Sequence, residues 1–285
     1  MHSIISVARN GIFRTLLQGR FYFIIFINIT LMKQLTDSIK DFSQLTGVKV
    51  VPCIFPFLMQ QTFIQLLFLV GATMLFCDAP FIAQDSSFEM IRIGKKKWLL
   101  GKLMYVIGMS FIYMATLMLI SGLLLFPQIT IQKGWGKALF TLAQTNAASV
   151  LGNDYIHLDY NLMLQYEPLE AMLMSGLMAW LVCIIVGLCI LVINLSFERL
   201  PGAVGGITVA MLPYFQKNFS NLHTMSFFSP GTWMNITLWN TKVRTHYPTV
   251  KYMVTFFALS IAIMAAISFL RFERVDDILK RKGEY

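Results

Sequence analysis

Long apolar runs are the feature that most constrains what this chain can fold into. The run at 169–197 carries a single charged side chain, Glu170, and comparable runs cover 99–126 and 252–270. A helix needs about 20 consecutive apolar residues to cross the hydrocarbon core of a bilayer, and these runs reach or approach that length. The composition agrees, because 56% of the residues are hydrophobic and only 13% are charged, whereas a soluble domain has about 25% charged residues. We therefore expect an all-α, polytopic membrane protein.

Three shorter or interrupted segments complete the predicted layout. The segment 21–42 begins with a short apolar stretch and either crosses the membrane or re-enters it, 50–77 has Pro52 and Pro56 near its start, and 202–215 is rich in glycine. The prediction is a single transmembrane domain over 1–285 with about six transmembrane helices, near 21–42, 50–77, 99–126, 169–197, 202–215 and 252–270. A long outer loop is expected at 127–168 and outer re-entrant elements at 216–251.

The first twenty residues are expected to form an amphipathic helix rather than a span. Apolar residues recur mostly at helical spacings, and Arg9, Arg14 and Arg20 are expected on the other side of the helix. Such a helix is suited to lying in the headgroup region. The alternative is a plain cytosolic start of the chain.

We interpret the excess of basic over acidic residues as an indication of membrane topology. The net charge is +9, but the basic clusters flank apolar runs and lack interleaved aromatic residues, which argues against nucleic acid as a partner. If the N-terminus is cytosolic, 14 of the 23 Lys and Arg residues fall on the inner side, in 1–20, 78–102, Arg199 and 271–285. Lys and Arg accumulate in cytoplasmic loops. We expect a multi-pass protein of the cell (plasma) membrane with both termini cytosolic.

The predicted spans contain almost no ionisable groups, so no catalytic, cofactor-binding or metal-binding residue is assigned. The chain lacks G-x-x-x-x-G-K-[ST], so it has no P-loop with which to hydrolyse ATP. Asp154, His157 and Asp159 form the only group that resembles a metal site, on the predicted outer loop, and their spacing matches no specific signature. A membrane-embedded enzyme that uses this loop is one alternative function, and a non-transporting sensor or immunity subunit is another.

The segment between the second and third predicted spans is the most informative. Ser86 and Glu89 have the spacing of a helix capping box, and Gly94 is placed to end the short helix that follows. Phe88 and Ile91, together with Met90, could form an apolar edge on that helix, ahead of three lysines. A short capped helix with exposed apolar residues is suited to docking into a groove on a cytosolic partner. The alternative is an ordinary basic loop.

This segment resembles the loop between spans two and three of the ABC exporter permeases of the second type. In that family a hydroxyl or small residue precedes an acid-bearing short helix, and basic residues and a Gly-Lys pair follow. The matching residues are Ser86, Ser87, Glu89, Lys95, Lys96, Gly101 and Lys102. Gly94 stands where proline is common in the family. The six-span layout, the amphipathic start and the outer elements at 216–251 are also similar to that family.

The resemblance implies a permease subunit that exports an amphipathic or hydrophobic cargo, such as a peptide, a lipid-like molecule or a drug. Separate cytosolic ATPase subunits would bind the ATP, and this chain would bind no cofactor itself. A second permease copy or a sibling would complete a homo- or heterodimer within membrane lipid. The implied ATPase-coupling helix comprises Ser86, Ser87, Phe88, Glu89, Met90, Ile91 and Arg92.

Two further groups of residues are candidates for contact with cargo. The aromatic residues Phe227, Phe228, Trp233 and Trp239 either gate the outer exit or form an interfacial aromatic belt. Gln61 and Gln65 are four residues apart and would share one face of a continuous helix. Polar groups in hydrocarbon need partners, so these glutamines either make helix–helix hydrogen bonds or face the cargo.

Overall fold

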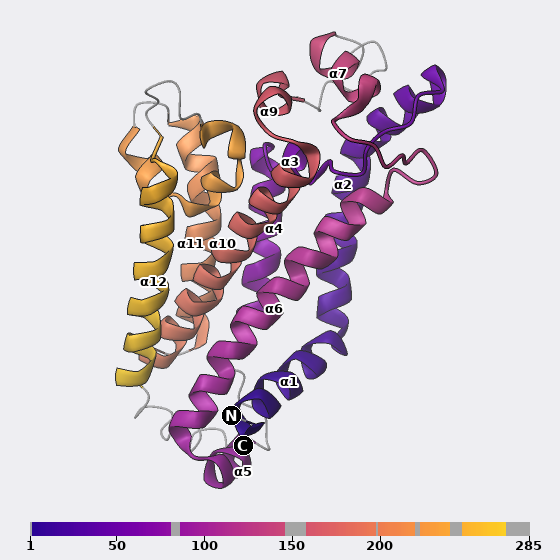
Figure 1. The fold of residues 1–285 in the computed structure, drawn as a ribbon. Helices are drawn as coiled ribbons and strands as arrows, with labels where there is room; N and C mark the ends of the chain where they lie inside the picture. Colours follow the sequence, from indigo (N-terminus) through magenta and orange to yellow (C-terminus); the bar gives the residue numbers. More distant parts are fainter. Residues whose placement is uncertain are drawn as a thin grey trace.

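The fold of the chain is all-helical in the computed structural model (Figure 1). The structure describes residues 2–80, 86–145, 158–197, 199–219, 223–239 and 247–271. Six long helices lie lengthwise, and each runs opposite to the preceding one along the chain (Figure 1). They are α2 (Gly19–Thr46), α4 (Thr62–Phe76), α6 (Lys95–Leu123), α10 (Pro168–Ser196), α11 (Arg199–Asn218) and α12 (Val250–Leu270).

The two ends of this helical bundle carry different short elements (Figure 1). At one end, here the α5 end, lie α1 (His2–Leu16) and α5 (Ser86–Ile93). At the opposite end, here the α7 end, lie the remaining short helices. They are α3 (Phe55–Leu58), α7 (Gly136–Gln144), α9 (Tyr160–Gln165) and the 3-10 helices η1 (His223–Phe227), η2 (Pro230–Met234) and η3 (Ile236–Trp239).

Three of the described helices, α6, α10 and α12, are long and apolar enough to cross a membrane. They cover the runs predicted at 99–126, 169–197 and 252–270. The bent pair α1 and α2, which meet at 63°, passes the same test when taken together and brings the number to four. The structure thus shows a helical protein with three or four segments that are long and apolar enough to cross a membrane. The run predicted at 202–215 lies inside α11, whose length of about 30 Å matches the hydrocarbon core.

The segment predicted as a continuous span at 50–77 is interrupted. Its first residues form a loop followed by the single turn of α3, and α4 begins only at Thr62. The loop is held by the outer segment, because the backbone of Val50 donates to the carbonyl of Gln128 at 2.9 Å and accepts from the amide of Thr130 at 2.9 Å. The 15 residues of α4 extend only about 22 Å, which is less than the roughly 30 Å of the hydrocarbon core.

A buried polar contact joins three of the long helices. The hydroxyl of Tyr113 on α6 donates to the carbonyl of Phe68 on α4 at 3.0 Å, and Asn28 on α2 donates to that hydroxyl at 3.4 Å. Gly71 makes this approach possible, because a Cβ there would lie on top of the Tyr113 hydroxyl. Small residues at such crossings let helices approach closely within a membrane. This contact positions α2 against the rest of the bundle.

Candidate coupling site at the α5 end

The helix predicted between the second and third spans is present as α5, and Gly94 separates it from α6. Gly94 has φ +89°, a conformation that side-chain-bearing residues rarely adopt. Its amide donates to the carbonyl of Met90 at 2.9 Å, and its carbonyl accepts from the amide of Trp98 at 3.0 Å. A single residue therefore ends one helix and begins the next, so α5 is joined to α6 without a flexible linker.

The faces of α5 differ in their environment. Met90 is buried, with 4% of its surface exposed, where α5 packs on α6, whereas Phe88 and Ile91 are 75% and 83% exposed. Arg92 is also exposed and Glu89 is half-buried. The side chains of Ser86 and Ser87 lie outside the described residues, so the predicted capping box remains a prediction. One buried residue thus anchors α5 while two large apolar side chains face outward.

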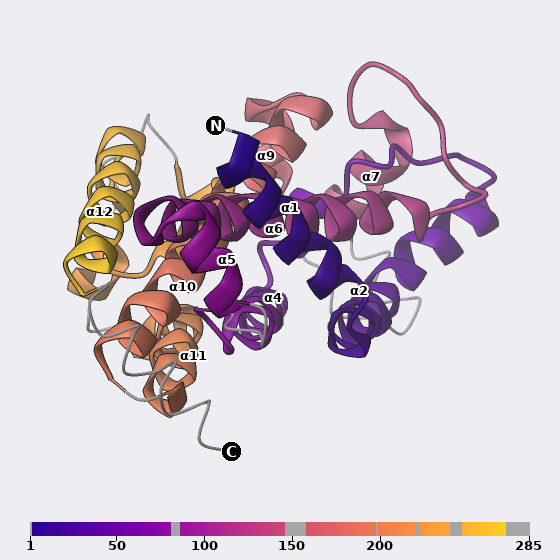
Figure 2. The ribbon, with the colours of Figure 1, turned by 90° about the horizontal axis from the view of Figure 1, so that it is seen from below.

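Helix α1 packs closely along the first turns of α6, as the view onto the α5 end shows (Figure 2). A Cβ at Gly101 would lie 2.7 Å from Cβ of Val7 and 3.1 Å from the carbonyl oxygen of Ile4. One turn later, the hydroxyl groups of Thr15 and Tyr105 hydrogen-bond at 2.7 Å. The glycine of the Gly-Lys pair is therefore required by the packing, because only glycine at 101 permits the close approach of α1 to α6.

The chain immediately before α5 is tied to two other long helices. Arg20 on α2 forms an ion pair with Asp78, and its guanidinium donates to Sγ of Cys77 at 3.0 Å. From α10, the amide of Asn194 donates to the carbonyls of Cys77 and Ala79 at 3.2 and 2.7 Å. The sequence analysis missed both contacts. The available signals were an asparagine within an apolar span and opposite charges at the inner ends of two consecutive spans.

Cations gather at the α5 end. The exposed ones among the described residues of α1, α5 and α6 are Arg9, Arg14, Arg92, Lys95, Lys96 and Lys97. Lys102 differs, since only 5% of it is exposed and its ammonium lies 4.9 Å from the centroid of the Trp98 ring. That distance is within the range of a cation–π interaction. The second residue of the Gly-Lys pair is therefore part of the packing between the short helices and α6.

The candidate gate residues lie at the α7 end, and two of the four are part of the core. Trp233 and Trp239 are 1% and 7% exposed, and their indole N–H groups donate to the carbonyls of Ser226 at 2.8 Å and Trp233 at 3.1 Å. Phe227 packs edge-to-face on Tyr252, with ring centroids 5.5 Å apart. Phe228 is 61% exposed. The two tryptophans are thus enclosed by protein, unlike the residues of an interfacial belt, while a gating role stays a prediction.

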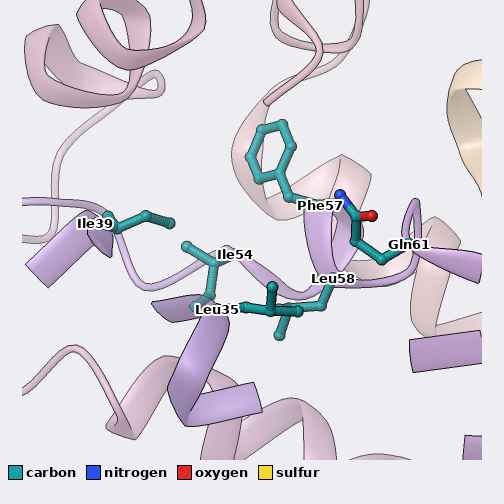
Figure 3. A pocket seen from close by; sticks show the side chains of 6 residues that line it. All are labelled: Leu35, Ile39, Ile54, Phe57, Leu58 and Gln61. Carbon is teal, nitrogen blue, oxygen red and sulfur yellow. The ribbon is translucent and has the colours of Figure 1, made fainter. Parts of the chain in front are cut away.

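Gln61 and Gln65 do not share a helical face, because Gln61 precedes α4 in an extended conformation. Gln65 is buried, and its amide donates to the carbonyl of Met59 at 2.6 Å, within the turn that starts α4. Gln61 lines a small apolar pocket between α2 and the α3 region (Figure 3). The other residues that line it are Leu35, Ile39, Ile54, Phe57 and Leu58. The predicted helix–helix hydrogen bonds are absent for these two residues among the described contacts.

The enzymatic alternative falls largely outside the described part of the chain. Asp154 and His157 belong to the residues that the structure does not describe. Asp159 is described, and it caps α9 by accepting a hydrogen bond from the amide of Asn161 at 2.8 Å. Within the described ranges, no group of three or more His, Cys, Asp or Glu side chains is arranged to hold a metal ion.

Comparison with known proteins identifies no family and no relative for this chain. No protein-family profile, no curated protein and no solved structure matches the chain. The functional conclusion therefore depends on the residues and contacts described above.

Proposed function

We propose that this chain is the permease subunit of an ATP-driven exporter in the cell membrane. It would cross the membrane six times with both termini cytosolic, and it would pair with a second copy or a sibling. Separate cytosolic ATPase subunits would dock on α5 and supply the energy. The cargo would be amphipathic or hydrophobic, because the long helices present few charged groups to a solute that passes between them.

The observation that carries this proposal is the exposed apolar pair on α5. Phe88 and Ile91 project from a helix that is anchored by Met90 and joined directly to α6. Large aromatic and aliphatic side chains on a rigid helix are the usual anchors for a groove on a partner protein. The chain also lacks a P-loop, so ATP hydrolysis by that route requires another subunit.

The contacts around α5 provide a route from the docking surface to the long helices. On one side, Gly94 and Met90 connect α5 to α6, and Gly101 brings α1 against the same helix. On the other side, Asp78 is paired with α2, and the carbonyls of Cys77 and Ala79 accept from α10. A displacement of α5 would therefore be transmitted to α6 and, through their close contact, to α1. ATP drives such a change only if the ATPase binds the two conformations with different affinity.

The distribution of cations supports the proposed orientation. The α5 end carries the arginines of α1 together with Arg92, Lys95, Lys96 and Lys97, and cytoplasmic segments next to spans are rich in Lys and Arg. Docking of a cytosolic ATPase requires α5 on that same side. The charge pattern and the exposed apolar pair thus point to the same side of the membrane.

The experiment that tests the proposal is purification of the tagged chain in mild detergent from its native cell, with the bound proteins identified by mass spectrometry. We expect an ATPase with a P-loop to co-purify with the unmodified chain and to be lost from Phe88→Asp. The matched control is Ile131→Asp, which introduces the same charge at a residue that is 95% exposed at the opposite end and should retain the ATPase.

A second measurement separates docking from coupling. After reconstitution of the complex, the ATPase rate is compared between the unmodified chain and the two variants at equal amounts of membrane-inserted protein. Recovery of no P-loop protein with the unmodified chain would refute the exporter proposal. Equal recovery and equal ATPase rates with Phe88→Asp would show that α5 is not the docking element.

A further inference from the structure

The exposed face of α1 is apolar and basic at once. Its protein-facing side includes Val7 and Thr15, which lie against Gly101 and Tyr105 of α6, and the larger Ile12 and Leu16, which pack against the core. Ile5 and Phe13, one turn on either side of Arg9, are 50% and 58% exposed, and Leu17 is 80% exposed. Part of the apolar side of α1 packs against the protein as expected, through Ile12 and Leu16, whereas Ile5 and Phe13 share the outer face with Arg9.

The outer face of α6 also combines exposed apolar side chains with lysines. From Leu100 through Met104 to Phe111, exposed apolar side chains recur every four to seven residues, which places them on one face of the helix. Lys96 and Lys97 are exposed at the base of this face. The lipid-facing side of a membrane-crossing helix thus ends in lysines at the level where α1 packs on it.

These two faces define one surface, formed by the outer face of α1 and the base of α6. Neither the described residues 2–20 nor 95–111 contain an Asp or a Glu, so no acid within these two segments offsets their positive charge. We propose that this surface binds the phosphate groups of anionic phospholipids in the adjacent leaflet, with the exposed apolar side chains inserted among the acyl chains.

The chemistry of the surface favours a lipid over other anionic ligands. Ile5, Phe13 and Leu17 would expose a contiguous apolar stripe to water, which soluble surfaces avoid, whereas the acyl boundary accepts them. Arginines in such a stripe reach the phosphate level, where they form charge-assisted hydrogen bonds. A zwitterionic headgroup offers the same phosphate with a cancelling ammonium, so the net positive charge of residues 2–20 and 95–111 selects for net negative lipids.

The test is native mass spectrometry of the full chain, stripped of lipid in detergent and titrated with phosphatidylglycerol or phosphatidylcholine of identical acyl chains. The double variant Arg9→Gln with Lys96→Gln is compared with Lys133→Gln with Lys137→Gln, whose lysines are exposed at the opposite end. We expect the first pair to weaken phosphatidylglycerol binding by about 25-fold, roughly fivefold per cation removed. Binding of phosphatidylcholine should not change, and the control pair should behave as the unmodified chain.

Two further arms make the outcome decisive. The charge-preserving double variant Arg9→Lys with Lys96→Arg should restore binding, which distinguishes loss of charge from loss of fold. Glycerol phosphate at the same concentration should not compete, because it lacks acyl chains. Equal affinity for both lipids, unchanged binding in the neutralised variant, or effective competition by glycerol phosphate would each overturn the proposal. The measurement uses neither ATP nor a partner protein, so its failure leaves the exporter proposal in place.

Discussion

The tryptophans of the α7 end and the apolar pair of α5 differ in their environment. At the α7 end, Trp135 and Trp233 are each only 1% exposed, and their indole N–H groups donate to backbone carbonyls. At the α5 end, Phe88 and Ile91 are mostly exposed, and cations surround them. Buried, hydrogen-bonded aromatic residues stabilise the fold, whereas exposed apolar residues beside cations indicate contact with another surface. The comparison distinguishes side chains that hold the α7 end together from side chains that we propose to contact a partner.

The largest effect is expected from a cavity at the α7 end. Trp233 contacts Phe256 and Phe257, with ring centroids 5.1 and 5.5 Å apart. Trp233→Ala should lower the free energy of unfolding by about 3–5 kcal/mol, measured by denaturant-induced unfolding in detergent. Phe228→Ala is the control, because this residue is 61% exposed and its loss should change stability by less than about 0.5 kcal/mol. Equal effects of the two substitutions would contradict the assignment of Trp233 to the core.

The second-largest effect tests the contrast between the buried Met90 and the exposed Ile91 of α5. Met90→Ala should destabilise the joint between α5 and α6 by about 2–4 kcal/mol, because Met90 is buried. Ile91→Ala removes a side chain that is 83% exposed and should leave stability within about 0.5 kcal/mol while it weakens ATPase association. Hydrogen exchange of α5 and co-purification of the ATPase measure the two properties. If Ile91→Ala loosens α5 as much as Met90→Ala, the helix does not have a separate docking face.

A smaller effect is expected where α1 approaches α6. Gly101→Ala places a Cβ 2.7 Å from Cβ and Cγ1 of Val7, and overpacking of this kind costs about 1–3 kcal/mol. Protease cleavage within α1 should therefore become faster. Gly19→Ala serves as the control, since nothing lies within 4 Å of its added Cβ. Unchanged cleavage in Gly101→Ala would mean that α1 is not held by this close approach.

The smallest effect concerns the link between α10 and the chain before α5. Asn194→Ala removes the donor to the carbonyls of Cys77 and Ala79, which should cost about 1 kcal/mol. Stability should fall slightly, but ATPase stimulation should fall more, because the proposed coupling requires α10 to stay fixed to the end of α4. The paired measurements are unfolding in detergent and ATPase rate in the reconstituted complex. A proportional loss of both would indicate a structural role only.

Hydropathy identified the long helices but not their place in the bundle. The spans α10 and α12 have similar mean hydropathy, 2.9 and 2.4, yet 67% of the first and only 17% of the second is buried within the protein. Lipid and protein interior are both apolar, so a sequence pattern does not distinguish between them. The interruption of 50–77 was not predicted for a related reason. The pairing of Val50 with Gln128 and Thr130 joins residues far apart in the chain.

The candidate site likewise has features that the sequence predicted and contacts that it did not. The break at Gly94 and the apolar edge of Phe88 and Ile91 follow from local chemistry, namely a positive φ and helical spacing. The contacts of Arg20 with Asp78 and of Asn194 with two carbonyls cross between helices. Their partners were not predictable, because many pairings of polar groups at span ends are compatible with one charge pattern.

The sequence by itself determined the helical class, the membrane-crossing runs and the short helix between the second and third long segments, because these depend on the spacing of neighbouring residues. Only the tertiary structure decided which apolar side chains are buried. It placed Trp233 and Met90 in the interior, and it left Phe88 and Ile91 of α5 and Ile5 and Phe13 of α1 outside. Burial depends on which helices meet, and those meetings are set by close approaches such as Gly71 with Tyr113 and Gly101 with Val7.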